Sequence, residues 1–199
     1  MRRRLLLIWL ALAAFAGAGE LPAEASWRIW FEAKSAHAPV ANPIPGAERT
    51  EWVAGFRGDD GLAYFSKQEF EGLKTTAEAF AKRARENAET DLQTLTPAYT
   101  RNRKKVIEYA ELHSDQPIVA SAILAPGFLK LFKDTLGEKV FVIIPNRFTA
   151  YVFPALASNY LDYAPMVFTA FGETAWPVST EVFEVSGHGV KSAGHFERP

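Results

Sequence analysis

The chain has 199 residues, of which 48% are hydrophobic and 23% charged, with a formal net charge of −1. This composition excludes an intrinsically disordered segment, which needs low hydrophobicity and high net charge. It also argues against a nucleic-acid-binding protein, because such proteins neutralise many phosphates with an excess of cations. The absence of cysteine excludes disulfides, thiolate metal sites and cysteine nucleophiles. The length suits one globular core.

The N-terminus has the order of a secretory signal peptide. A cationic segment (Met1–Arg4) precedes an apolar run (Leu5–Ala16), and small residues follow at the spacing that signal peptidase recognises. We therefore predict a signal peptide within residues 1–25, cleaved after Ala18 or Ala25, and a periplasmic or extracellular protein. The alternative is a membrane anchor, but a spanning helix needs roughly 20 apolar residues. We expect no stable membrane span after cleavage. Export without cysteine is typical of a bacterial envelope protein.

The first half of the mature chain predicts strands and then a helix. An aromatic strand is expected at Trp27–Phe31, followed by a proline-rich loop over residues 37–46. Two further strands, at residues 51–56 and 62–65, flank a hairpin turn at residues 58–61. Ser66 and Glu69 then form a capping box that begins a helix running to about Thr90.

The second half predicts alternating strands and helices. Residues 104–112 fit either a helix or a strand, and their Val, Ile and Tyr content favours a strand. Asp115 is expected to cap a helix over residues 118–124, which Pro126 interrupts or restarts. The remaining elements are a helical face from 128 to Gly137, a strand at 140–144, a turn at Pro145-Asn146, a returning strand at 147–153, a helix at about 159–171 that Pro165 kinks or begins, and a strand at 180–185.

This order predicts an α+β fold with an antiparallel-rich sheet and about three helices packed mainly on one face. Residues 26–185 are expected to form a single domain. The glycine-rich segment 186–199 is expected to be a flexible tail.

The segment from about Val106 to Val185 resembles a known family. Asp115–Leu124 precedes Gly127–Lys130, then comes Val140–Pro145, a second strand, and a helix that ends before Trp176-Pro177-Val178-Ser179. This order resembles the C-terminal part of the YtpQ-like family of bacterial proteins of unknown function. The resemblance implies an α+β fold, and it implies no catalytic or ligand-binding residue.

The chemistry-bearing residues form no complete catalytic or metal-binding motif. His113, Ser114 and Asp115 include the residue types of a hydrolase triad, but neighbours on a strand point to opposite faces. The four histidines lack metal-ligand spacing, and the segment around Lys191 lacks the Gly-Lys pair of a phosphate loop. We therefore predict no catalytic residues, no metal and no cofactor.

Two short motifs leave alternatives open. Arg57-Gly58-Asp59 matches an adhesion tripeptide, although the hairpin turn explains the same residues. The basic cluster at residues 101–105 indicates either an anionic surface or polymer as partner, or a solvated loop before a strand.

The aromatic content supplies the only binding candidates. Trp27, Trp30, Trp52 and Trp176 either form a recognition surface or belong to the core. We predict an exported, non-enzymatic binding or interaction module whose partner is a protein or a cell-envelope component. The alternative is a small secreted hydrolase with dispersed catalytic residues.

Overall fold

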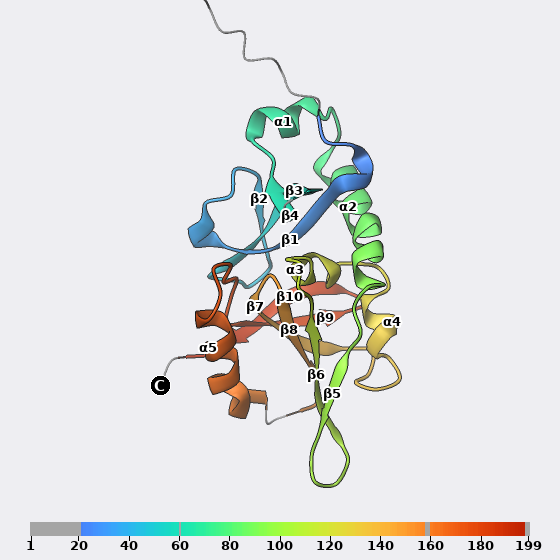
Figure 1. Ribbon diagram of the computed structural model, residues 1–199, viewed down its shortest axis with the longest axis vertical. Helices are drawn as coiled ribbons and strands as arrows, with labels where there is room; N and C mark the ends of the chain where they lie inside the picture. Colours follow the sequence, from blue (N-terminus) through green and yellow to red (C-terminus); the bar gives the residue numbers. More distant parts are fainter. Residues whose placement is uncertain (1–20, 60, 158–159, 198–199) are drawn as a thin grey trace, which may run out of the picture.

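A computed structural model of the chain describes residues 21–59, 61–157 and 160–197. Two antiparallel sheets, one in each half of the molecule in the view of Figure 1, form the framework. This arrangement confirms the predicted α+β class. Most of the predicted signal peptide, including cleavage after Ala18, lies outside the described residues.

The first sheet is built around the long strand β3 (Thr50–Gly58). β1 (Trp27–Ala33) pairs with it along seven residues, and β2 (Ala41–Pro43) and β4 (Gly61–Tyr64) share its other edge. The pairing of Gly58 with Gly61 confirms the predicted hairpin. Gly55 is required here, because a Cβ at this position would lie 2.5 Å from the Trp30 ring.

The second sheet has six strands in the order β10-β9-β7-β8-β6-β5. Every pairing in it is antiparallel. The strands are β5 (Ala98–Arg101), β6 (Ile107–His113), β7 (Val140–Asn146), β8 (Thr149–Pro154), β9 (Glu181–Ser186) and β10 (Gly189–His195). The ambiguous segment 104–112 is a strand from Ile107 onward, as predicted, whereas residues 104–106 lie in the turn before it. Its partner β5 had no sequence prediction.

Five α-helices are present in the described residues, rather than three. They are α1 (Lys67–Gly72), α2 (Ala77–Leu92), α3 (Val119–Ala122), α4 (Phe128–Phe132) and α5 (Ala164–Gly172). Three 3-10 segments accompany them: η1 (Glu24–Ser26), η2 (Lys34–Ala36) and η3 (Tyr160–Tyr163). α3 lies between the two sheets in Figure 1.

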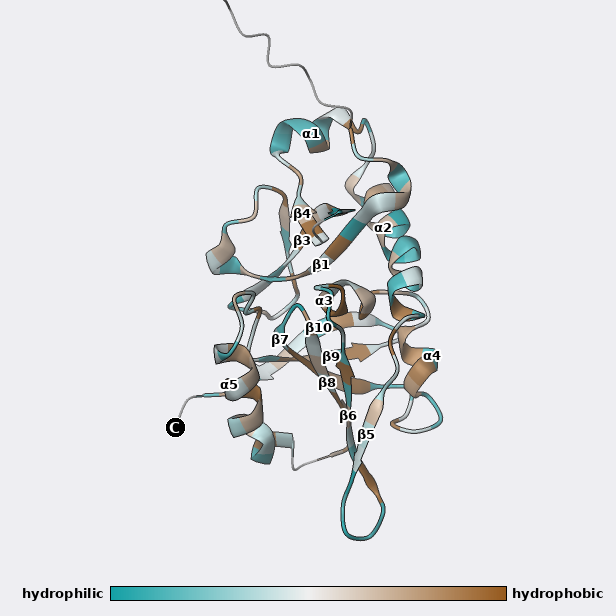
Figure 2. Cartoon of the chain, viewed as in Figure 1, coloured by the Kyte–Doolittle hydropathy of each residue, from teal (hydrophilic) through white to brown (hydrophobic). Residues whose placement is uncertain are grey.

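The helices pack mainly on one face of the six-stranded sheet, as predicted, and α5 covers the other face. The main hydrophobic core joins the first sheet, α2, α3 and α4 to one face. A second cluster, which includes Phe153, Val167 and Phe196, packs α5 against the other. Apolar residues accordingly dominate the central strands in Figure 2, as the continuous run in β7 predicts.

The helix predicted from Ser66 to Thr90 is two helices. The capping box is present, since Ser66 Oγ accepts from the Glu69 N–H at 3.1 Å and the Glu69 carboxylate accepts from the Ser66 N–H at 2.7 Å. Lys74 then adopts a left-handed φ of 53°, which ends the first helix. Thr76 caps the second by accepting from the Ala79 N–H. The break lets Phe70 pack edge-on against Phe80.

Two local predictions around α3 and β7 are wrong. Asp115 does not cap α3, because that helix begins at Val119, whose N–H donates to the Arg147 carbonyl. The turn falls after Pro145-Asn146, at residues 147–148, where the Asn146 side chain accepts from the Phe148 N–H. Pro165, by contrast, lies at the start of α5. Of the two alternatives for this proline, a kink or a helix start, the second is confirmed.

The prediction of a flexible tail at residues 186–199 is also wrong over most of that segment. β10 pairs with β9, and Phe196 after it is buried. The strand closes an edge of β9 that would otherwise leave backbone groups unpaired. Its glycines serve special conformations instead of flexibility, since Gly189 begins the strand with φ of 111° and Gly194 follows a register shift with φ of 132°.

Candidate functional site

The four tryptophans do not form one surface. Trp27 stacks on Phe80 with ring centroids 5.0 Å apart and is nearly buried. Trp52 is half-buried beneath the Arg85 guanidinium, 5.5 Å from its ring centroid. Two of the four meet at a single residue, because Trp30, which is fully buried, and Trp176, which is 47% exposed, both contact Arg147.

Arg147 belongs to a buried charged cluster between the two sheets. Its guanidinium forms an ion pair with Glu32 of β1 and donates to the Tyr64 hydroxyl at 2.7 Å. The Glu32 carboxylate also accepts from Trp30 Nε1 at 3.0 Å and from Tyr64 at 2.9 Å. Burial, followed by the nearby Glu32 charge, raises the pKa of Tyr64 to about 12. Because these groups satisfy one another, the cluster is a structural connection and not an open binding site.

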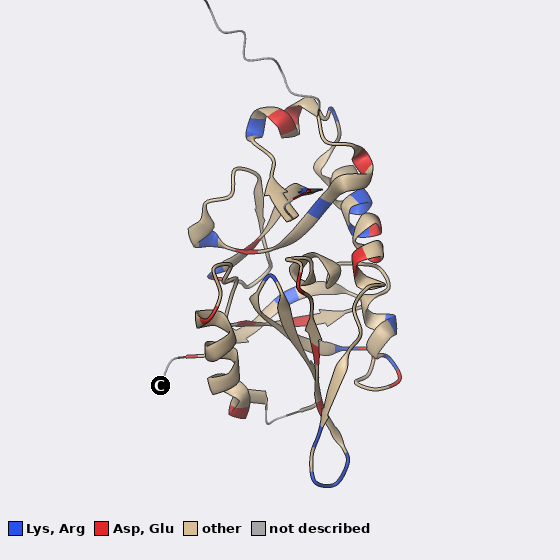
Figure 3. Cartoon of the chain, in the orientation of Figure 1, with Lys and Arg blue, Asp and Glu red and all other residues tan. Residues whose placement is uncertain are grey.

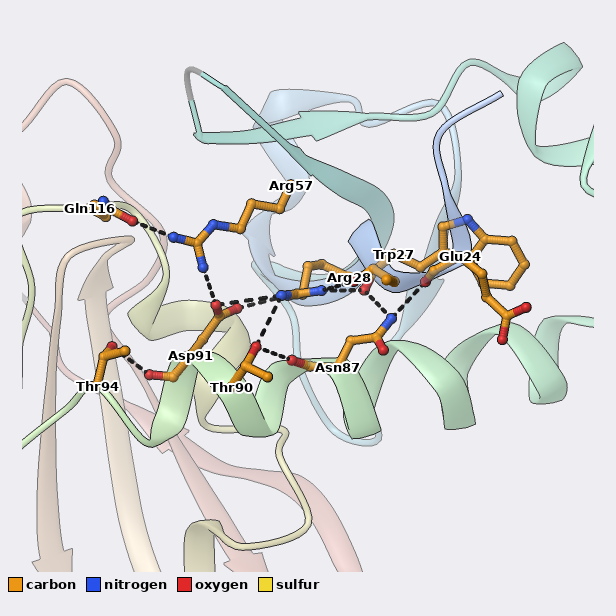
Figure 4. A network of polar contacts seen from close by, with 10 residues as sticks. Glu24, Trp27, Arg28, Arg57, Asn87, Thr90, Asp91, Thr94 and Gln116 are labelled. Carbon is orange, nitrogen blue, oxygen red and sulfur yellow. Dashed lines mark hydrogen bonds and ion pairs between the residues drawn. The ribbon is translucent and has the colours of Figure 1, made fainter. Parts of the chain in front are cut away.

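A second buried network surrounds Asp91 near the end of α2 (Figure 4). Its carboxylate accepts from Arg28 Nε at 2.7 Å and forms an ion pair with Arg57, which also donates to Gln116. Arg57, the first residue of the adhesion-like tripeptide, is thus held by two partners within the chain. This network ties α2 to the first sheet and to the segment before α3.

The His113–Asp115 segment does not make a triad. His113 Nδ1 lies 3.1 Å from Thr149 Oγ1, and its Nε2 lies 3.9 Å from an Asp115 oxygen. Ser114 Oγ instead accepts from the Gln116 N–H. The His113 side chain is 59% exposed, so it lies on the surface and not in a site that excludes water. In the described ranges, no group of three histidine or carboxylate side chains is arranged to hold a metal ion.

A cavity of about 770 Å³ lies where the first sheet, α5 and the last two strands meet. One part of its lining is polar and cationic, and another is aromatic. The polar residues are Lys34, Ser35, Arg49, Ser179, Thr180, His195 and Glu197, and the apolar ones are Ala33, Phe168, Phe171, Val178 and Phe196. This volume is in the range of small-molecule sites, which are mostly apolar with a few polar groups that set orientation.

Two permanent cations face one permanent anion in this lining. Lys34 Nζ donates to the Ala47 carbonyl at 3.0 Å, which leaves two of its protons for another acceptor. Arg49 is exposed, and the described part of the chain offers its guanidinium no hydrogen bond or ion pair. The carboxylate is that of Glu197, 3.9 Å from His195 Nε2. The arrangement favours an anionic group beside an apolar body.

Sequence reasoning missed this cavity. Lys34 directly follows β1, and Arg49 directly precedes β3. The aromatic rings come from α5 and from the chain beyond β10. No periodicity or spacing connects residues so far apart. The one usable signal was the phenylalanine content, which the tryptophan argument did not include.

Comparison with protein-family models, curated proteins and solved structures finds no match to the chain. The resemblance to the YtpQ-like family therefore stays a prediction. Among the described residues, no helix is long and apolar enough to cross a membrane.

Proposed function

We propose that this protein is an exported, non-enzymatic binding module whose cavity takes a small organic anion with an apolar body. The observation that carries the proposal is the pairing of Lys34 and Arg49 with the rings of Phe171 and Phe196 in one cavity of about 770 Å³. Cations would contact a carboxylate, sulfonate or phosphate, while the rings would cover an alkyl or aryl group.

Binding, and not catalysis, is supported by how the polar groups of the lining are used. Ser179 Oγ accepts from the Thr50 hydroxyl at 2.6 Å and from the Glu181 N–H at 3.0 Å. His195 lies near Glu197 but makes no hydrogen bond to a hydroxyl anywhere in the described chain. A nucleophile activated by a base needs such a contact.

Of the two cleavage sites, Ala18 is the one we propose, because cleavage there leaves the contacts of residues 22–25 in place. The carbonyl of Glu24 accepts from Asn87 at 2.7 Å, and that of Ala25 accepts from Arg28. Trp27 Nε1 donates to the Pro22 carbonyl. Cleavage after Ala25 would remove these three acceptors. The intact mass of the protein recovered from the cell envelope distinguishes the two forms, and an uncleaved mass would contradict export.

A fluorescent anion tests the cavity directly. Anilinonaphthalene sulfonate combines an aryl body with a sulfonate, and its emission rises in an apolar site. We expect saturable binding at one site, weakened about tenfold by Arg49→Ala because one charge-assisted contact is lost. Octanoate should displace the probe, and octanol, which has the same chain without a charge, should not.

The matched control is Lys67→Ala, which removes an exposed cation of α1 that does not line the cavity. It should leave binding of the probe unchanged. Equal weakening by both variants would show non-specific attraction of anions, and the absence of saturable binding would refute the proposal. Phe171→Ala gives a second check. It should weaken binding of the probe without altering how that binding depends on ionic strength.

A further inference from the structure

One end of the molecule carries a concentration of unpaired positive charge. β5 and β6 continue beyond the other strands as a hairpin whose tip is basic (Figures 1 and 3). The four cations are Arg101, Arg103, Lys104 and Lys105. In the part of the chain that the structure describes, none of them forms an ion pair.

The tip has a defined conformation. Asn102 Oδ1 accepts from the N–H groups of Lys104, at 2.9 Å, and Val106, at 3.1 Å. The Asn102 N–H donates to the Val106 carbonyl, which closes the turn. Lys105 adopts φ of 64°, where asparagine or glycine is the usual residue. A charged side chain therefore occupies a backbone position for which it is poorly suited.

Exposed aliphatic side chains accompany these charges. Val106 is 57% exposed, Leu156 97% and Leu161 54%, and they are three of the five large exposed apolar residues in the described chain. Val106 adjoins the tip itself. The other two belong to the segment that follows β8.

That segment lies beside the base of the hairpin. β6 pairs with β8 through Ala110 and Val152, so the end of β8 and the start of β6 share one end of the sheet. Tyr163 of η3 packs against Tyr109 with ring centroids 5.0 Å apart. Burial, followed by the nearby Glu108 carboxylate, raises the pKa of Tyr163 to about 12. The aliphatic residues and the basic tip thus lie at the same end of the molecule, which we call the hairpin end.

We propose that the hairpin end binds the surface of an anionic phospholipid bilayer. The four cations would contact headgroup phosphates, and Val106, Leu156 and Leu161 would enter the interfacial layer. Charge combined with isolated aliphatic side chains is the pattern of peripheral membrane attachment. Single-stranded nucleic acid would call for aromatic stacking residues, which the tip lacks. This inference concerns a surface separate from the cavity and does not depend on what the cavity binds.

Acidic groups do not cancel the charge of the tip. Glu108 lies near Tyr163, and Asp162 is exposed within η3 beside Leu161. Both lie at the base of the hairpin, whereas the cations lie at its tip. The tip would therefore meet the bilayer first.

Vesicle co-sedimentation tests the proposal with the chain from Gly19 onward, which keeps every described residue. Vesicles with about 30 mol % phosphatidylglycerol in phosphatidylcholine should bind it, and pure phosphatidylcholine should not. The variant Arg103→Gln/Lys104→Gln/Lys105→Asn should lower the partition coefficient roughly 100-fold, at about fivefold for each cation. Leu156→Ser/Leu161→Ser should lower it about tenfold while leaving its dependence on salt unchanged.

The matched control removes three cations from the opposite end of the molecule. Lys67→Gln/Lys74→Asn/Lys82→Gln removes the same charge and also replaces a left-handed lysine with asparagine. Its partition coefficient should stay within about twofold of the parent. Equal losses in both triple variants would overturn the proposal, because net charge alone would then explain binding. Binding to polyphosphate but not to the vesicles would overturn it as well.

Discussion

The two faces of the six-stranded sheet are joined to their neighbours by different chemistry. Toward the first sheet, contact includes the buried Glu32–Arg147 ion pair and the Thr50–Ser179 hydrogen bond of 2.6 Å. Toward α5, contact is mainly apolar and aromatic, centred on Phe153 and Val167, with one hydrogen bond of 2.8 Å from the Asn146 side chain to the Ala170 carbonyl. Directional polar contacts permit one arrangement of the two sheets, whereas rings and methyl groups tolerate small displacements.

The largest effect is expected at the charged interface. Glu32→Gln keeps the shape of the side chain but leaves the Arg147 charge buried without its counter-ion. We expect a loss of about 3–5 kcal/mol in the free energy of unfolding, measured by urea denaturation at pH 7.

A double variant separates charge from packing at this interface. Glu32→Gln/Arg147→Met removes both charges, so it should be more stable than Glu32→Gln alone. A single-variant loss below about 1 kcal/mol would mean that the pair behaves like an exposed salt bridge. The contrast between the two faces would then fail.

A smaller and more local effect is expected at the α5 face. Val167→Ala removes two buried methyl groups, which should cost about 2 kcal/mol including the space left behind. Hydrogen exchange should rise mainly in α5, since that helix depends on this contact. An equal rise in β1 and β3 would show that the two faces are not independent.

The smallest effect at neutral pH concerns the tyrosines that lie on either side of the sheet. Burial is the first cause that raises the pKa of Tyr64, at the charged interface, and of Tyr151, in the aromatic cluster, to about 12. In the unfolded chain tyrosine ionises near its ordinary pKa of about 10. Stability should therefore be complete below pH 10 and fall as the pH rises toward 12.

Absorbance of tyrosinate measures this directly. Tyr64→Phe and Tyr151→Phe should each remove a late-ionising group from the titration of the folded protein. The stability of each variant should also decline less steeply than that of the parent between pH 10 and 12. Ionisation of all tyrosines in one step near pH 10 would contradict the burial of both.

The sequence predicted elements wherever local physics decides the structure. The apolar run Val140–Ile144 could only be a covered strand, and Ser66 with Glu69 satisfies a helix terminus without tertiary help. Elements decided by distant partners were missed. Asp115 lost its capping role to the Arg147 carbonyl. The glycines near the C-terminus indicated flexibility because the pairing of their segment with β9 is invisible to local patterns.

The candidate site was harder to predict than the fold. Trp30 and Trp176 were selected for their size, and the structure uses them around Arg147, which no spacing singles out. Lys34 and Arg49 become neighbours of Phe196 only because the two sheets pack against each other. A cavity between elements is a property of tertiary packing, so its lining leaves no periodic trace.

β10 has a consequence for how the chain is made. Among the described strands it leaves the ribosome last, yet the Ser192 N–H donates to the Pro45 carbonyl beside the first sheet, and Phe196 fills the aromatic cluster. During vectorial synthesis or translocation, the cavity would therefore form only after β10 has emerged. A premature stop codon before Gly187 would leave β9 as an open edge, so the shortened chain should be prone to edge-to-edge aggregation and to proteolysis.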